Sequence, residues 1–335
     1  MRNLSRHILR PLLIVLAFVL GARAAAPDPL PSWNSGPVKQ SVVSFVSAAT
    51  SKNGSGYIAP EDRIAVFDND GTLWSEQPIY VQFAFALDRV RALAPLHPEW
   101  KTTQPFKAAL EGDMAALQAS GEKGLGELLI GTHTGMTTEQ FAGTVANWLA
   151  SARHPQCNCP YTDRVYVPML ELLSYLRANG FKTYIVSGGT IEFVRAFAEP
   201  VYGIPPEQVI GSSFVIQFKL GADGKPILMR EPRIDFIDDG PGKTVGINKF
   251  IGRRPVFAFG NSDGDQQMLE WTAAGSGPRF AGLVHHTDAT REHAYDRTSK
   301  IGRLDKALDE AHAKGWTVVD MSRDWRTVFP RAGTK

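Results

Sequence analysis

The fold is decided by the stretch Ile64-Ala65-Val66-Phe67-Asp68-Asn69-Asp70-Gly71-Thr72-Leu73-Trp74. Its first four residues form a short apolar run, which is typical of a buried strand when turn residues follow it. Two carboxylates one residue apart, Asp68 and Asp70, come directly after the run, and Gly71 then indicates a tight turn. The segment therefore predicts a buried strand that ends in two acidic side chains.

Further strands alternate with helices downstream of this segment. Buried strands are indicated at 182–186, 256–259 and 281–284. The helices expected between them include 169–178 and 190–198. Strands separated by helices are typical of a parallel sheet with crossover helices, so the expected fold class is α/β.

Two segments interrupt this alternation. Apolar residues recur every three or four positions through most of 80–160, which predicts a helical lid between the first strand and the rest of the sheet. Residues 214–220 alternate between apolar and polar side chains, and the Asp-Gly pair at 223–224 is a hairpin signal. Both segments are interpreted as insertions into the α/β core.

Polar residues suited to chemistry follow several of these strands. In an open α/β sheet, ligands bind beyond the carboxyl ends of the strands, where Asp68 is expected. Ser187 and Gly188 end the second strand, and Asn261 lies just past the third. Lys243 opens the helix that leads into the third strand. These side chains are therefore expected to meet at one edge of the sheet.

Four segments, taken in order, resemble the motifs of the haloacid dehalogenase (HAD) superfamily. They are Asp-x-Asp-Gly-Thr at 68–72, Val-Ser-Gly-Gly at 186–189, the lysine at 243, and Gly-Asn-Ser-Asp-Gly-Asp-Gln-Gln-Met-Leu at 260–269. The last is similar to the motif of the phosphoserine-phosphatase-like branch, except that Asn261 stands where that branch has an acid. The resemblance covers about 61–80 and 160–290. It implies a Rossmann-like parallel sheet, the HAD core, with a helical cap after the first motif and a small β-hairpin insert.

The resemblance assigns roles to the residues of the first two motifs. Asp68 is the expected nucleophile and a metal ligand. Asp70 is expected to bind the metal through its backbone carbonyl and to act as acid and base through its side chain. Thr72 would orient the nucleophile loop next to the substrate, while Ser187 and Gly188 would hold phosphate oxygens.

The last two motifs supply a cation and further metal ligands. Lys243 is expected to neutralise the nucleophile and the transferring phosphoryl group, with Lys249 as the alternative lysine. Asn261 and Asp265 are expected to complete the metal site, with Asp263 as an alternative ligand. An amide oxygen is an acceptable hard ligand for Mg²⁺, which is the expected cofactor.

The resemblance implies a Mg²⁺-dependent phosphomonoester hydrolase that acts through an aspartyl-phosphate intermediate on small organic phosphates. Dehalogenases of the superfamily lack the second acid, so Asp70 argues against a carbon–halogen substrate. A phosphotransferase of the same family is an alternative. A second alternative is a catalytically degenerate periplasmic binding protein, because Asn261 departs from the motif.

The N-terminus predicts export from the cytoplasm. Three arginines precede an apolar run at 11–20, and Ala-Arg-Ala at 22–24 fits a cleavage site, so 1–24 is interpreted as a signal peptide. The run is shorter than the ~20 residues needed to span a bilayer. We therefore expect a periplasmic or secreted protein with no stable membrane anchor after cleavage.

Charge limits the expected partners. The whole chain has 36 Lys and Arg against 34 Asp and Glu, a formal charge of +2. Residues 1–24 contain four of the arginines and no acid, so the rest of the chain carries −2. A chain of this balance has no nucleic-acid-binding signature. The expected partner is a small-molecule phosphate monoester, and oligomeric state cannot be read from the sequence.

The expected organisation has four parts. They are a signal peptide at 1–24, a lead-in and helix at 25–60, the HAD core at 61–79 and 161–335, and the helical cap at 80–160. Cys157 and Cys159 are the only cysteines. They could form a disulfide in an oxidising compartment or remain two free thiols in a surface loop, and a zinc site lacks further ligands.

Overall fold

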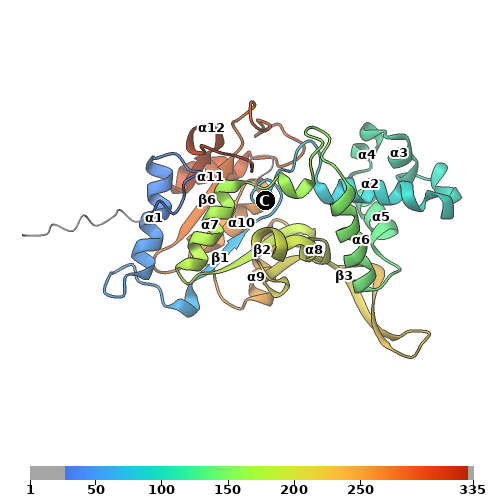
Figure 1. The fold of residues 1–335 in the computed structure, drawn as a ribbon, viewed down its shortest axis with the longest axis horizontal. Coiled ribbons are helices and arrows are strands. Elements are labelled where there is room, and N and C mark those ends of the chain that lie inside the picture. Colours follow the sequence, from blue (N-terminus) through green and yellow to red (C-terminus); the bar gives the residue numbers. More distant parts are fainter. Residues whose placement is uncertain (1–26, 331–335) are drawn as a thin grey trace, which may run out of the picture.

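The computed structural model describes residues 27–330, so the expected signal peptide lies outside the described residues. A central sheet carries helices on both faces, and a group of helices stands beside it (Figure 1). The described helices are α1 (Pro37–Thr50), α2 (Val81–Leu93), α3 (Phe106–Glu111), α4 (Met114–Ala119), α5 (Gly121–His133), α6 (Thr138–Ser151), α7 (Val167–Ala178), α8 (Ile191–Tyr202), α9 (Pro241–Phe250), α10 (Gln266–Ala273), α11 (Lys306–Lys314) and α12 (Met321–Asp324).

The sheet within residues 27–330 has seven strands in the order β4-β3-β2-β1-β5-β6-β7. The strands are β1 (Ile64–Phe67), β2 (Lys182–Thr190), β3 (Val209–Leu220), β4 (Pro226–Phe236), β5 (Phe257–Gly260), β6 (Phe280–His285) and β7 (Thr317–Asp320). All neighbouring pairs are parallel except the antiparallel pair β3–β4. The expected α/β class is confirmed, and β1 has the predicted bounds.

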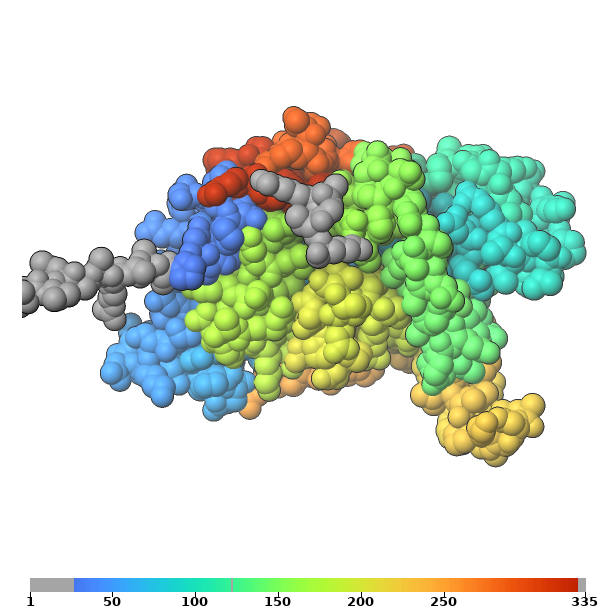
Figure 2. Space-filling model, in the orientation of Figure 1, coloured from blue at the N-terminus to red at the C-terminus, as the bar shows by residue number. Residues whose placement is uncertain are grey.

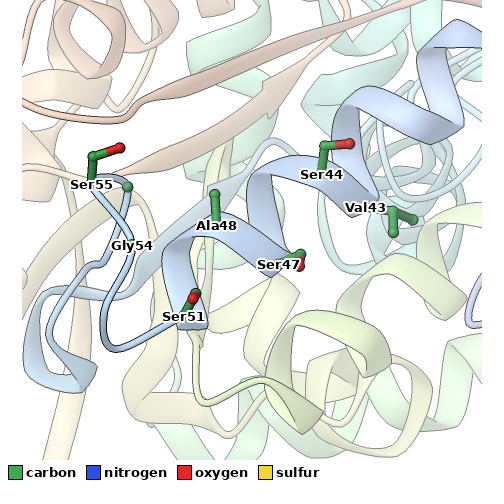
Figure 3. Close-up of a pocket in the computed structure, with 8 residues that line it drawn as sticks. Val43, Ser44, Ser47, Ala48, Ser51, Gly54 and Ser55 are labelled. Carbon is green, nitrogen blue, oxygen red and sulfur yellow. The ribbon is translucent and has the colours of Figure 1, made fainter.

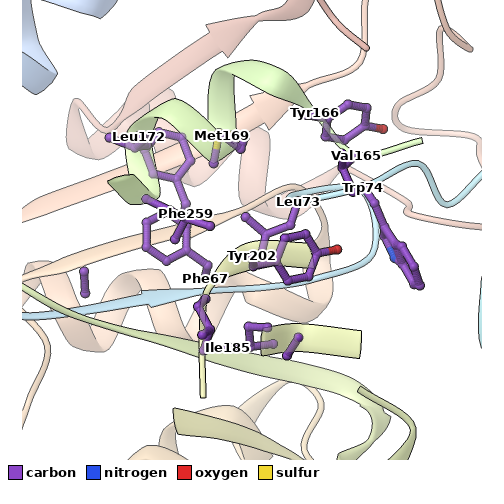
Figure 4. Close-up of a cluster of buried hydrophobic side chains, with 14 of the residues drawn as sticks. Phe67, Leu73, Trp74, Val165, Tyr166, Met169, Leu172, Ile185, Tyr202 and Phe259 are labelled. Atoms are coloured by element: carbon purple, nitrogen blue, oxygen red, sulfur yellow. The ribbon is translucent and has the colours of Figure 1, made fainter. Parts of the chain in front are cut away.

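Both faces of β1 are buried, which explains its continuous apolar sequence. Successive side chains of a strand point to opposite faces. Ala65 and Phe67 accordingly join a cluster with α1, α7 and α8. Ile64 and Val66 join a second cluster with α9, α10 and α11. Figure 4 shows part of the first cluster, in which Phe67 lies among side chains from α7 and β5. The strand that carries the site is thus clamped between two layers of helices.

Helices α2 to α6 form the cap, which lies within the 80–160 segment. The cap has an apolar core of its own, which includes Leu87, Val90, Trp100 and Leu128. Helix α6 packs against α8 of the core, and α5 contacts β4. Figure 2 shows the cap as a separate lobe beside the core. Thr137 and Gln140 form a capping box at the start of α6.

The β-hairpin is larger than the sequence analysis predicted. Strand β3 begins at Val209, pairs in parallel with β2 through Ile210 and Gly211, and only then continues into the hairpin with β4. The predicted hairpin insert is therefore present, and its first strand, β3, also belongs to the core sheet. The far end of the hairpin projects from the molecule below the cap (Figure 2).

Two further features complete the fold. Cys157 and Cys159, in the loop after α6, are joined by a disulfide. Among the helices described for 27–330, none is both long enough and apolar enough to cross a membrane.

Candidate active site

The residues predicted to carry chemistry lie at one edge of the sheet. Strand β1 lies between β2 and β5 and runs parallel to both, so the carboxyl ends of all three strands meet. Asp68 follows β1 directly, and Asn261 follows β5. Ser187 lies within β2, which continues to Thr190 after an irregularity in its pairing with β3. The prediction that β2 ends before Ser187 is corrected in this respect.

A buried lysine joins two buried carboxylates at this edge. Lys243 Nζ lies 2.5 Å from Asp68 Oδ1 and 2.5 Å from Asp265 Oδ1, and it donates a third hydrogen bond to the Val186 carbonyl at 3.1 Å. All three charged side chains are buried. The alternative Lys249 is exposed and lies over the rings of aromatic residues, so the geometry favours Lys243 as the lysine of the site.

Burial and charge together set the protonation behaviour of this cluster. Burial raises the pKa of Asp68 well above its ordinary value, the charge of Asp265 adds to this, and Lys243 opposes it. Burial alone would lower the pKa of Lys243, but the two carboxylates raise it above its usual range. The two carboxylates therefore favour the charged form of Lys243 beside the predicted nucleophile, Asp68.

Asp70 is held by an aromatic side chain. Trp74 is fully buried, stacks on Phe197 at 4.4 Å between ring centroids, and donates its Nε1–H to Asp70 Oδ1 at 2.7 Å. Burial raises the pKa of Asp70, and the bond from Trp74 works against that rise. Trp74 thus belongs to the core and at the same time fixes the proposed acid.

The first and fourth motifs are bonded to each other. The Thr72 hydroxyl donates to Asn261 Oδ1 at 3.1 Å. The Thr72 side chain is therefore buried against the fourth motif and does not face solvent. Gly71, with φ of 76°, has no room for a side chain, because a Cβ there would lie 2.0 Å from Asn261 Nδ2. The Asp-Gly-Thr turn therefore has a steric reason for its glycine as well as a conformational one.

The two aspartates that follow Asn261 have different partners. Asp265 uses one oxygen for Lys243, and the other accepts the backbone N–H groups of Asn261 at 2.9 Å and Ser262 at 3.0 Å. Asp265 therefore orients Lys243 and holds the loop that begins at Asn261. Asp263 accepts the backbone N–H groups of Asp305 and Ala307 instead, so it caps the start of α11 and turns away from the site.

The oxygen donors at this edge suit Mg²⁺. In the described part of the chain, no group of three His, Cys, Asp or Glu side chains is arranged to hold a metal ion. Of the four expected ligands, Asp265 has both carboxylate oxygens occupied by Lys243 and by the backbone N–H groups of Asn261 and Ser262. The remaining expected donors are the Asp68 carboxylate, the backbone carbonyl of Asp70 and the side-chain carbonyl of Asn261. Mg²⁺ prefers such hard oxygens, keeps several waters and needs few protein ligands, so this donor set fits it.

The phosphate-binding segment is connected to the cap. Ser187 is buried and its hydroxyl accepts the Gly189 N–H at 3.1 Å, while Gly188 is exposed at the edge. Gln82 of the cap makes two hydrogen bonds to Thr190, one from its amide to the hydroxyl at 2.6 Å and one from the backbone N–H of Thr190 at 2.8 Å. The cap therefore contacts the segment expected to bind phosphate.

Support for the nucleophile loop also comes from residues that the sequence analysis did not assign. His286 is buried, and its Nε2 lies 2.8 Å from the Gly71 carbonyl, while its Nδ1 lies 3.3 Å from Glu292 Oε2. Glu292 Oε1 also accepts the Ser75 hydroxyl at 2.7 Å. The only available signal was the position of His286 directly after β6, at the same edge of the sheet.

A pocket elsewhere on the surface is separate from this cluster. It lies at the end of α1 and is lined mainly by small side chains, among them Ser44, Ser47 and Ser51 (Figure 3). This end of α1 leads toward the start of β1, whereas the charged cluster lies at the carboxyl end of that strand. The pocket therefore has no part in the candidate active site.

The chain belongs to the haloacid dehalogenase-like hydrolase family, whose model matches residues 65–270. This confirms the family predicted from the four motifs. No curated protein matches the chain.

Solved structures give a fold comparison. A protein of unknown function from Bordetella pertussis Tohama I is 16% identical with a TM-score of 0.51, over 77% of this chain and 98% of that one, which indicates a shared fold. A functionally unknown protein from Anaerococcus prevotii is 17% identical with a TM-score of 0.48, over 84% and 91% of the two chains. A phosphoserine phosphohydrolase-like protein from Francisella tularensis is 17% identical with a TM-score of 0.35, over 75% and 98%.

Proposed function

We propose that this hydrolase is a Mg²⁺-dependent phosphomonoesterase that acts on small organic phosphates through a phosphorylated Asp68. The observation that carries the proposal is the cluster in which Lys243 Nζ lies 2.5 Å from Asp68 Oδ1, with Asp70 two residues further along the same loop. A carboxylate can approach a phosphate monoester only when a cation screens their repulsion. Lys243 is such a cation, and the oxygen donors around Asp68 fit a second one.

The first step transfers the phosphoryl group to the protein. One oxygen of Asp68 forms a bond to phosphorus while the bond from phosphorus to the ester oxygen breaks. The leaving oxygen keeps the electron pair of the broken bond and receives a proton from Asp70. Burial raises the pKa of Asp70, which favours the protonated carboxyl that this step needs. The product alcohol departs and Asp68 carries the phosphate.

The second step releases phosphate. Water attacks the phosphorus and gives its proton to Asp70, and the bond between phosphorus and the Asp68 oxygen breaks. Lys243 stays charged beside Asp68 throughout, because both neighbouring carboxylates raise its pKa. A bound Mg²⁺ supplies further positive charge beside the phosphoryl oxygens. The exposed Gly188 and the buried Ser187 are suited to contact those oxygens.

We further propose that the protein works in the periplasm or is secreted. The signal-peptide pattern at 1–24 supports this, and so does the disulfide between Cys157 and Cys159, since disulfides persist in oxidising compartments. Expression of the full-length chain in a bacterial host, followed by cell fractionation and N-terminal sequencing, tests it. A mature protein that begins near residue 25 in the periplasmic fraction is expected.

The activity is tested with p-nitrophenyl phosphate and the purified protein from pH 4 to 9, with and without Mg²⁺. We expect turnover that chelator abolishes and that Asp68→Asn lowers by about 10⁴-fold or more, as for removal of a covalent nucleophile. The matched control is Asp263→Asn, which alters an acid of the same region that caps α11. Turnover by Asp68→Asn at the normal rate would reject Asp68 as nucleophile.

Two alternatives are separated by the same assay. A phosphotransferase would pass phosphate to an added acceptor alcohol in preference to water. A binding protein would show no turnover with any ester while it still bound phosphate compounds. A panel of phosphate monoesters that includes phosphoserine and phosphocholine then defines the substrate class.

A further inference from the structure

One buried carboxylate at the catalytic edge belongs to none of the four motifs. Glu76 lies eight residues after Asp68, and only 2% of it is exposed. Its Oε1 accepts two hydrogen bonds, one from Asn261 Nδ2 at 2.7 Å and one from the Tyr295 hydroxyl at 2.6 Å. Three segments distant in the sequence therefore meet at this single oxygen.

The contact with Glu76 fixes the orientation of the Asn261 amide. The Nδ2 end faces Glu76, and the Oδ1 end faces the nucleophile loop, where it accepts the Thr72 hydroxyl at 3.1 Å. A carbonyl oxygen has two lone pairs, so one lone pair of Oδ1 is left for a cation. With an aspartate at 261, two carboxylate oxygens would stand about 2.7 Å apart without a proton between them, which is strongly unfavourable.

The space around Glu76 is shaped for a carboxylate at this position. Gly71 and Gly302 border it from two different loops, with φ of 76° and 61°. A Cβ would lie 2.4 Å from Glu76 Oε1 at the first glycine and 1.8 Å from it at the second. Tyr295 is also held in place, because its ring stacks on His286 at 4.4 Å between centroids. Each neighbour of Glu76 thus either gives it room or donates to it.

We propose that Glu76 performs the charge-compensating role that an acid at position 261 would otherwise have, and that it holds the Asn261 amide with its oxygen toward the metal. A single aspartate at position 261 would supply both the negative charge and the metal-binding oxygen. Here Glu76 supplies the acid and Asn261 supplies the oxygen, from two different loops. Glu76 is a positioning residue in this account, because it acts on the ion through Asn261. The inference rests on the proposed function for the identity of the ion, Mg²⁺.

The test is an exchange of the two side chains, with Mg²⁺ affinity of the metal-stripped protein measured by calorimetry. Glu76→Gln replaces the acid with an amide that cannot ionise, and it should weaken Mg²⁺ binding by about 10- to 100-fold, the usual cost of losing a residue that supports a metal ligand. Glu76→Gln combined with Asn261→Asp restores one acid and one amide. This double variant should bind Mg²⁺ within about threefold of the unaltered protein.

The single variant Asn261→Asp tests the same idea without metal. It places two carboxylates side by side, so its thermal midpoint in chelator should fall below that of the unaltered protein. Added Mg²⁺ should then raise the midpoint of Asn261→Asp by more than it raises that of the unaltered protein, since the ion separates the two charges. This measurement remains available if Glu76→Gln alone fails to fold.

Glu292→Gln is the matched control. Glu292 is a buried carboxylate in the same region, but its partners include Ser75, His286 and Tyr166 and not Asn261. Any loss of affinity in Glu292→Gln should therefore not be restored by Asn261→Asp. Unchanged Mg²⁺ affinity in Glu76→Gln, or no recovery in the double variant, would overturn the inference. Neither readout uses turnover, so a failure of the proposed function appears separately, as unchanged turnover in Asp68→Asn.

Discussion

Two buried cations of this molecule invite comparison, one at the catalytic edge and one at the junction of hairpin and cap. Lys243 lies between the carboxylates of Asp68 and Asp265. Arg230, on β4, has a fully buried side chain and lies 2.6 Å from the Glu192 carboxylate of α8. The first cation belongs to the candidate active site. The second binds three parts of the fold to one another.

The contacts of Arg230 define this second role. Its Nε donates to the His133 carbonyl at 2.6 Å, and its guanidinium lies 4.0 Å from the centre of the Phe141 ring, so it contacts both α5 and α6 of the cap. Its backbone bonds to the loop between those helices, through Gly135 at 2.9 Å and Met136 at 3.0 Å. Figure 1 shows the β3–β4 hairpin reaching the cap at this place.

The comparison teaches that a buried cation can have different roles, depending on the residues that surround it. At the candidate active site, one cation faces two carboxylates, and the nearby Gly188 is exposed to solvent. At the junction, the cation is paired with one acid and covered by aromatic rings. Removing either cation leaves at least one acid without its counter-ion, but only the loss of Lys243 should affect the chemical step.

The largest effect is expected for Lys243→Met. This change leaves Asp68 and Asp265 buried without their counter-ion, so the free energy of unfolding should fall by about 3–5 kcal/mol. Turnover should fall by at least about 10²–10³-fold, because an electrostatic stabiliser of the reaction is lost. Urea unfolding and steady-state kinetics measure the two effects. The exposed Lys249→Met is the control and should change stability by less than about 0.5 kcal/mol.

Arg230→Met should separate stability from chemistry. Loss of the cation strands Glu192, so the free energy of unfolding should fall by about 3 kcal/mol. Turnover of the folded fraction should change by less than about threefold, because Arg230 does not touch Asp68 or Lys243. Lys219→Met on the same hairpin is the control: its ion pair with Glu231 is partly exposed and contributes about 0–1 kcal/mol. A loss of turnover as large as that of Lys243→Met would refute the division of roles.

The free energy of unfolding is predicted to depend on pH through Asp238, which lies near Lys243. Within residues 27–330 neither of its carboxylate oxygens has a hydrogen-bond partner, and burial raises its pKa to about 7, against the opposing charge of Lys243. Between about pH 4 and 7 the folded protein therefore holds a proton that the unfolded chain has released, so stability falls as pH rises, by about 1.4 kcal/mol per pH unit at most.

Asp238→Asn should remove this slope. Its free energy of unfolding should match that of the unaltered protein near pH 4 and exceed it at pH 8. Urea unfolding at several pH values provides the measurement. Asp235→Asn, at an exposed position of the adjoining strand, is the control and should keep the original slope. A slope as steep in Asp238→Asn as in the unaltered protein would assign the pH dependence to another group.

The smallest effect is expected outside both cation sites, at the disulfide. Cys157 and Cys159 close a loop of three residues, so reduction should lower the free energy of unfolding by only about 1–2 kcal/mol. Turnover should be unaffected by reductant, since the loop does not touch the charged cluster. A variant with serine at both positions should not respond to reductant at all.

The sequence predicted the catalytic edge well because each of its residues lies next to a strand end or opens a helix. The positions of Asp68, Ser187 and Asn261 could be predicted in this way, and the resemblance to the HAD motifs assigned a role to each. Local spacing fixed β1 because all four of its residues are apolar. The candidate site could thus be assembled from short segments without knowledge of long-range contacts.

The supporting residues could not be predicted because their partners are remote in the chain. Gln82 bonds to Thr190 across 108 residues, and His286 to Gly71 across 215. Asp263 resembled a ligand from its position in the motif, yet it caps α11 across 42 residues. Strand β7 also escaped prediction, because a strand of four residues, three of them partly exposed, gives no clear periodicity. Such contacts depend on tertiary structure that no local pattern specifies.

The most direct test of the account is detection of the phosphoryl group on Asp68. Protein quenched in acid during turnover of a phosphate monoester should gain the mass of one phosphoryl group, and peptide mapping should place it on the segment that contains Asp68. The adduct should be absent from Asp68→Asn and from protein treated with chelator. Steady turnover with no adduct at Asp68, or with the adduct on another residue, would contradict the account.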